Sequence, residues 1–225
     1  MKPRITLAEV GLPDGNILTL QSHDGRIAIL SHGEQVCGPA TRAGEEELGR
    51  LACAPFRPVR QPKIWIAGAG LGAIATTVTQ ELGQKRGTFI VAEPVPAILD
   101  WHRDHLPDSP LLKDERFIIE SDAGVGGLHA HTGSLHAIIV HLDASPDGSD
   151  GRRLPENPRW LAAAYEALID GGLLAVGGTR PLLGLFRKLR RQGFDVAEHS
   201  VPSSPLAKKP RMIPILLARK GRYQG

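Results

Sequence analysis

A glycine-rich loop has the residue types and spacing of a nucleotide site. An apolar run (residues 64–67) leads into it, and a helix-forming stretch (residues 73–82) follows. Glycines permit the tight turn and close approach of a ligand, and the helix N-terminus offers unpaired N–H groups. The spacing fits either the dinucleotide fingerprint, with Ala73 as its third small residue, or the loop that binds S-adenosylmethionine (SAM). The loop consists of Gly68, Ala69, Gly70, Leu71 and Gly72.

Three carboxylates follow the next three apolar runs, at the predicted strand ends where ligands of α/β sheets bind. Glu93 stands where an acid typically accepts from ribose hydroxyls. Asp122 could accept from an adenine amino group, and Asp143 would face the transferring group. The alternative is that acids follow strands only because loops are polar. Three in register favour a site, and carboxylates suit a cationic sulfonium better than a pyrophosphate.

The histidines and serines predict no further centre. The histidines of residues 129–141 have no helical i, i+4 pair, so we expect partly exposed structural side chains and no metal site. Those at 102 and 105 are expected on a solvated helix face. The serines lack the context of a nucleophile elbow. The histidines are His102, His105, His129, His131, His136 and His141.

Strand and helix patterns alternate after residue 60, which predicts a parallel sheet with helices on both faces. The last two expected strands, 194–201 and 212–218, have no helix between them and should pair antiparallel. That ending is typical of the SAM methyltransferase-like fold. The other expected strands are 88–92, 116–120, 137–142 and 173–176; the expected helices are 95–105, 159–169 and 182–191, with a short helix or loop at 123–129.

The N-terminal part predicts a small β appendage. Asp24-Gly25 between two alternating apolar runs indicates a hairpin within residues 5–36, and residues 45–52 have a helical pattern. We therefore expect an N-terminal region at 1–58 and a SAM-type α/β domain at 59–225. An isolated hairpin is marginally stable, which favours packing against a partner subunit in a homodimer.

Composition narrows the class of protein. The chain has 225 residues, 41% hydrophobic content and a net charge of +3. Neither a membrane-spanning run nor a signal peptide is expected, and two cysteines without metal-type spacing suggest a cytoplasmic protein with reduced thiols. Basic clusters occur late in the chain, but 4% aromatic content makes a nucleic-acid partner unlikely.

Taken in order, these motifs resemble the spermidine synthase-like family over nearly the whole chain. The resemblance implies that the glycine loop holds decarboxylated SAM, or SAM, as a co-substrate rather than as a tightly bound cofactor. It further implies that Glu93 holds the ribose, that Asp122 with Ala123 reaches the adenine, and that Asp143 deprotonates the attacking amine. Gln35 and Ser145 would bind the second substrate, a small amine.

Three departures weaken the likeness to a true spermidine synthase. Leu71 replaces the acid that binds the donor's amino group, Gly44-Glu45 replaces an aromatic-His pair, and Pro146 replaces a second acid. The leading expectation is transfer of an aminopropyl-type group to an amine, with polyamine specificity unsettled. The alternatives are a SAM methyltransferase, a non-catalytic nucleoside-binding or scaffold protein, and, more distantly, an NAD oxidoreductase.

Overall fold

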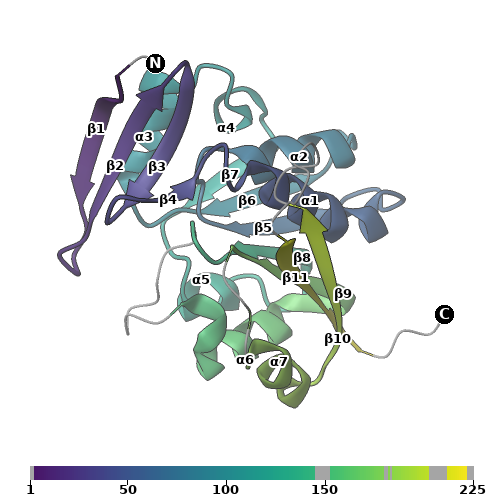
Figure 1. Cartoon of the computed structure of the whole chain (residues 1–225). Helices are drawn as coiled ribbons and strands as arrows, with labels where there is room; N and C mark the ends of the chain where they lie inside the picture. The colour runs from purple at the N-terminus through teal and green to yellow at the C-terminus, as the bar shows by residue number, and fades with distance from the viewer. Residues whose placement is uncertain (1–2, 145–152, 180–181, 183, 203–211, 222–225) are drawn as a thin grey trace.

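The computed structural model describes residues 3–144, 153–179, 182, 184–202 and 212–221, and contains two β-sheets (Figure 1). The smaller sheet is antiparallel throughout and follows chain order. Asp24 and Gly25 both have positive φ, as a type I′ hairpin turn requires, so the predicted hairpin is confirmed within a larger sheet. Its strands are β1 (Ile5–Gly11), β2 (Ile17–His23), β3 (Arg26–Ser31) and β4 (Glu34–Cys37).

The larger sheet has seven strands in the order β10-β11-β9-β8-β5-β6-β7. Pairing is parallel from β9 to β7 and antiparallel at β9-β11 and β11-β10. The predicted methyltransferase-like sheet with a terminal antiparallel hairpin is therefore confirmed. Its strands are β5 (Lys63–Ala67), β6 (Thr88–Ala92), β7 (Phe117–Glu120), β8 (Leu135–His141), β9 (Leu168–Gly177), β10 (Phe194–Pro202) and β11 (Met212–Lys220).

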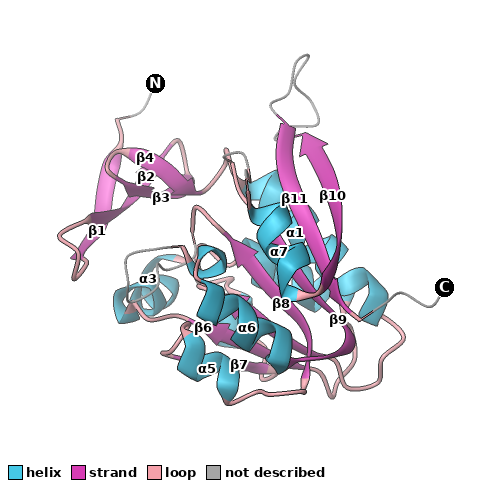
Figure 2. Cartoon of the chain, turned by 90° about the horizontal axis from the view of Figure 1, so that it is seen from below, coloured by secondary structure: helices cyan, strands magenta, loops and turns pink. Residues whose placement is uncertain are grey.

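Helices cover both faces of this sheet, and the central strands are apolar on both sides (Figure 2). In β5, Trp65 faces the cluster built with α5, α6 and α7, whereas Ile64 and Ile66 face the cluster built with α1, α2 and α3. The helices are α1 (Arg42–Cys53), α2 (Ala73–Glu81), α3 (Pro96–His105), α4 (Pro110–Lys113), α5 (Val125–His129), α6 (Pro158–Ala167) and α7 (Leu185–Gln192), with 3-10 turns η1 (Ala54–Phe56) and η2 (Leu154–Glu156).

Two predicted boundaries are wrong because glycines act differently from expectation. Gly171 and Gly172 do not follow the end of a helix; they lie in an irregular start of β9, where the partner of β8 jumps from residue 168 to residue 173. Gly171 adopts φ +77°, and α6 has already ended at Ala167. Gly184, with φ +80°, is the N-cap of α7, so this helix begins at residue 185 and not at the predicted residue 182.

Candidate functional site

A cavity of about 800 Å³ lies where the carboxyl ends of the parallel strands meet the N-terminal sheet. Strand β5 stands between β6 and β8, so the chain runs in opposite directions across the sheet on either side of the glycine loop. Such a switch point is where α/β sheets bind ligands. The N-terminal sheet closes the other wall with residues from Leu12 to Cys37.

The cavity brings together four of the predicted site residues: Gln35, Gly70, Glu93 and Asp143 all line it. The remaining loop residues stand behind Gly70. Leu71 is half-buried and packs against the apolar cluster of α1, α2 and α3. Ser145 lies outside the described residues.

The glycine loop is a tight left-handed turn. Gly68, Gly70 and Gly72 have φ of +83°, +51° and +82°, which side chains other than glycine's rarely adopt. The N–H of Gly68 still donates to the Ala92 carbonyl at 2.9 Å, so the loop leaves the sheet directly from the end of β5. These glycines are required by backbone conformation, as the sequence pattern predicts.

Glu93 is buried, with 3% of its surface exposed, and it fastens the loop to β6. One carboxylate oxygen accepts from the N–H of Ala69 at 2.8 Å, and the other accepts from the N–H of Val95 at 2.9 Å. Burial raises the pKa of Glu93, while the two backbone donors act against that rise. The carboxylate is therefore held rigidly beside Gly70, and each oxygen can still accept a further hydrogen bond; its binding of a ribose stays a prediction.

Asp143 follows β8 and is also mostly buried. Its Oδ2 accepts from the N–H of Thr179 at 2.5 Å, and no hydrogen bond reaches its Oδ1 from the described residues. His141, in β8, has 1% of its surface exposed, which corrects the expectation of a partly exposed side chain. Neither of its ring nitrogens has a hydrogen-bond partner in the described part of the chain, and Nε2 lies 4.0 Å from Asp143 Oδ2.

His102 corrects the predicted solvated helix face. It is 1% exposed and contacts the glycine loop from α3, with Nε2 3.0 Å from the Gly70 carbonyl and Nδ1 2.7 Å from Ser109 Oγ. Because a carbonyl can only accept, Nε2 carries the proton and Nδ1 accepts from the serine hydroxyl. Burial lowers the pKa of His102, which favours this neutral form.

Cys37, at the end of β4, is a site residue that the sequence analysis missed. Its side chain is buried, lines the cavity and packs against Gly70 of the loop. Burial raises the pKa of Cys37 well above its ordinary value, and the Glu45 carboxylate raises it further, so the group is a neutral thiol. Only the packing of β4 against the glycine loop reveals Cys37 as a site residue, and no local sequence signal indicates that packing.

Asp122 does not line the cavity. It is exposed, and its Oδ1 accepts from the N–H of Gly124 at 2.7 Å, at the start of α5. Its backbone lies so close to the helix that a Cβ at residue 127 would be 2.0 Å from its carbonyl oxygen. Ala123 is buried, and its carbonyl accepts from Trp160 Nε1 at 3.0 Å. The adenine-binding role of this pair stays a prediction.

The remaining histidines do not converge. His131 links Glu120 (3.0 Å) to the Lys63 ammonium (3.1 Å), and His136 accepts from the Lys63 N–H. Across the described ranges there is no group of three or more His, Cys, Asp or Glu side chains placed to hold a metal ion. Among those same residues, no helix has the length and apolar character needed to cross a membrane.

Comparison with solved structures gives extensive fold matches at low sequence identity. Spermidine synthase from Thermotoga maritima superposes with a TM-score of 0.74 at 17% identity, covering 96% of this chain and 73% of that one. A probable spermidine synthase from Corynebacterium glutamicum gives 0.66 at 14% identity, covering 98% and 81%. Precorrin-6y C5,15-methyltransferase from Geobacter metallireducens gives 0.56 at 17% identity, covering 76% and 87%. Neither the models of known protein families nor the curated proteins give a match.

Proposed function

We propose that this chain, which has the fold of the spermidine synthases, is a transferase that moves an aminopropyl-type group from an adenosyl sulfonium donor to an amine. The observation that carries the proposal is one cavity, at the sheet's switch point, lined by the glycine loop, Glu93 and Asp143. A spermidine synthase with this fold has been solved with the transition-state analogue AdoDATO, which supports a donor of this class.

In the proposed reaction, the lone pair of the amine attacks the carbon attached to the sulfonium sulfur. The N–C bond forms as the C–S bond breaks, and the sulfur keeps the bonding electrons and leaves as a neutral thioether. The extra proton on nitrogen passes to Asp143, whose Oδ2 is fixed by Thr179. The protein contributes alignment of the reacting atoms and a base at the correct position.

Efficient synthesis of spermidine from putrescine is not expected. A side chain at Gly44 would come within 2.7 Å of Ile213, so close packing of α1 on β11 leaves no room there for an aromatic residue. Glu45 is buried and accepts from the Thr41 hydroxyl at 2.6 Å, and neither residue lines the cavity. Contacts to a diamine from this helix are therefore missing.

Methyl transfer from SAM is the second candidate. Leu71 supplies no acceptor for the ammonium of a decarboxylated donor, and its side chain packs into the apolar cluster instead. A methyltransferase is also among the proteins that share the fold.

The nucleoside product tests both candidates. The chain is incubated with SAM or decarboxylated SAM and a panel of primary amines, and the products are separated by chromatography. Methylthioadenosine shows that the propyl chain moved, whereas S-adenosylhomocysteine shows that methyl moved. Asp143→Asn should bind methylthioadenosine like the wild type and lose at least about 100-fold in turnover.

Asp195→Asn, on the exposed surface of β10, is the matched control and should keep wild-type turnover. Binding of methylthioadenosine without product from any amine would contradict the transferase and favour a nucleoside-binding protein. Absence of binding as well would contradict the site itself.

A further inference from the structure

Three carboxylates of the cavity already accept hydrogen bonds, whereas two of its side-chain donors have no acceptor among the described residues. Glu93 accepts from two backbone N–H groups, Asp143 from one, and Asp14 from the backbone and side chain of Asn16. By contrast, Gln35 Nε2 is buried without a hydrogen-bond partner in the described part of the chain. No acceptor of the described residues reaches this amide nitrogen, although carboxylates line the same cavity.

Arg153 is the second donor without a partner. It is half-buried and precedes η2, and it is the one arginine or lysine among the described residues that line the cavity. Within the described ranges no hydrogen bond or ion pair reaches its guanidinium, although several carboxylates line the same cavity. Its charge is thus left for a ligand.

The chemistry of these two donors selects an anionic oxygen group. A guanidinium presents its N–H groups as a planar fork that matches a carboxylate, and an amide N–H₂ can donate to the same group. A buried donor without an acceptor is costly, so the ligand that completes the cavity is expected to bring that acceptor.

We propose that Arg153 and Gln35 bind the α-carboxylate of the donor's amino-acid tail, so that the donor is SAM rather than its decarboxylated form. This inference rests on the proposed function and narrows it. The group transferred is then 3-amino-3-carboxypropyl instead of aminopropyl. The N–C bond formed, the C–S bond broken, the methylthioadenosine released and the transfer of the proton to Asp143 remain as described.

Three thioether nucleosides that differ stepwise in their tail test the proposal by calorimetry on the full chain. Methylthioadenosine has neither amine nor carboxylate, decarboxylated S-adenosylhomocysteine has the amine, and S-adenosylhomocysteine has both. S-adenosylhomocysteine should bind about 10- to 100-fold more tightly than its decarboxylated analogue, the range expected for a charge-assisted hydrogen bond.

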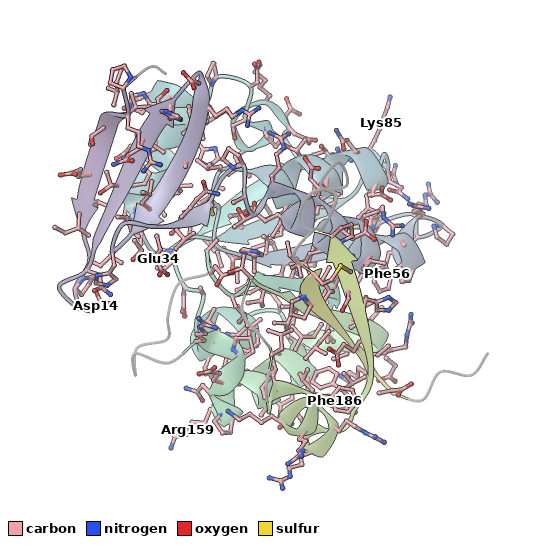
Figure 3. All side chains as sticks on the ribbon, in the orientation of Figure 1. Asp14, Glu34, Phe56, Lys85, Arg159 and Phe186 are labelled. Carbon is pink, nitrogen blue, oxygen red and sulfur yellow. The ribbon has the colours of Figure 1, made fainter. Side chains whose placement is uncertain are left out.

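Arg153→Gln should abolish that preference and leave the affinity for methylthioadenosine unchanged. Arg153→Lys should keep part of this preference, because the positive charge remains although the planar fork of N–H donors is lost. The matched control is Arg159→Gln, an exposed residue of α6 that lies far from Asp14 and Glu34 in Figure 3; this variant should bind all three nucleosides like the wild type. Thermal unfolding of each variant checks its fold, and Arg153→Lys serves if the glutamine variant is unstable.

The outcomes separate this inference from the proposed function. If methylthioadenosine binds but S-adenosylhomocysteine binds no more tightly than its decarboxylated analogue, the inference is overturned while the nucleoside site stands. This result would be obtained if Arg153 and Gln35 bind a carboxylate of the acceptor instead. A preference that survives in Arg153→Gln also overturns it. If none of the three nucleosides binds, the proposed function itself fails.

Discussion

At the scale of single residues, Gly70 and Cys37 pack closely together in the site. A Cβ at Gly70 would lie 3.0 Å from the Cys37 sulfur, and φ of +51° already disfavours a side chain. Gly133 has a similar φ of +62° with nothing within 4 Å of its Cβ position, so it isolates the conformational cost.

We predict that Gly133→Ala lowers the free energy of unfolding by about 1–2 kcal/mol and that Gly70→Ala lowers it further. Adding Cys37→Ala to Gly70→Ala should recover the excess, because the sulfur is removed. Urea denaturation gives the free energy of unfolding of the wild type, the two glycine variants and the double variant. Equal losses for the two glycine variants would mean that the thiol moves aside without cost.

Residue spacing predicted Glu93 and Asp143 because each directly follows a buried strand, and strand ends converge in a parallel sheet. It did not predict His102, Cys37 or Arg153. Their places depend on which distant segments pack together, since β4, α3 and the residue before η2 come to the cavity and its loop from three separate parts of the chain. A histidine in a polar helix pattern looks solvated until the loop that covers it is placed.

At the scale of elements, the glycine loop is held by three neighbours before any ligand binds. Glu93 accepts from Ala69, His102 donates to the Gly70 carbonyl, and the Cys37 sulfur packs against Gly70. These contacts come from β6, β4 and α3, so the loop is fixed by both sheets and a helix. Such bracing holds the loop in one conformation, which would lower the entropy lost by a ligand site formed there.

The lowered pKa of His102 predicts how this bracing depends on pH. The unfolded chain takes up a proton near pH 6.5, whereas the folded chain keeps His102 neutral to a lower pH. Stability is therefore full above about pH 6.5 and declines as the pH falls from there towards the folded pKa. We predict a steeper loss in the wild type than in His102→Gln, measured by urea denaturation between about pH 7.5 and 5.

His136, whose pKa burial also lowers, is present in both proteins, so it cancels in that comparison. Identical pH profiles would show that His102 is not held neutral.

Among the elements, the alternation of strand and helix patterns in the sequence predicted nearly every strand and helix, because hydrophobic period and turn residues are local signals. The start of β9 was missed, because Gly171 and Gly172 were interpreted as the end of a helix and the shifted register against β8 is a non-local feature.

At the scale of the whole molecule, the N-terminal sheet is joined to the α/β part by a common core. Leu20 and Ile29 from the sheet belong to the same buried cluster as Leu48 of α1 and Trp101 of α3. The cavity lies between the two parts, so their relative position sets its shape. The homodimer stays a prediction, and exposed Ile5 on β1 leaves apolar surface for a partner.

The shared core predicts that both parts unfold together. All three tryptophans lie beyond residue 59: the fluorescence of Trp65 and Trp160 reports the α/β part, whereas Trp101 also packs in the cluster that contains Leu20. Leu20→Ala removes a fully buried side chain from the N-terminal sheet and should lower the free energy of unfolding by about 2–5 kcal/mol.

We expect this loss to shift the tryptophan transition as a single step. Ile17→Ala, which truncates a side chain 54% exposed on the neighbouring part of β2, is the control and should change stability by less than about 0.5 kcal/mol. A tryptophan transition that stays in place while far-UV circular dichroism shows an earlier loss of strand would mean that the sheet unfolds alone. The cavity wall could then open without disturbing Glu93 and Asp143, and the site would not depend on one cooperative fold.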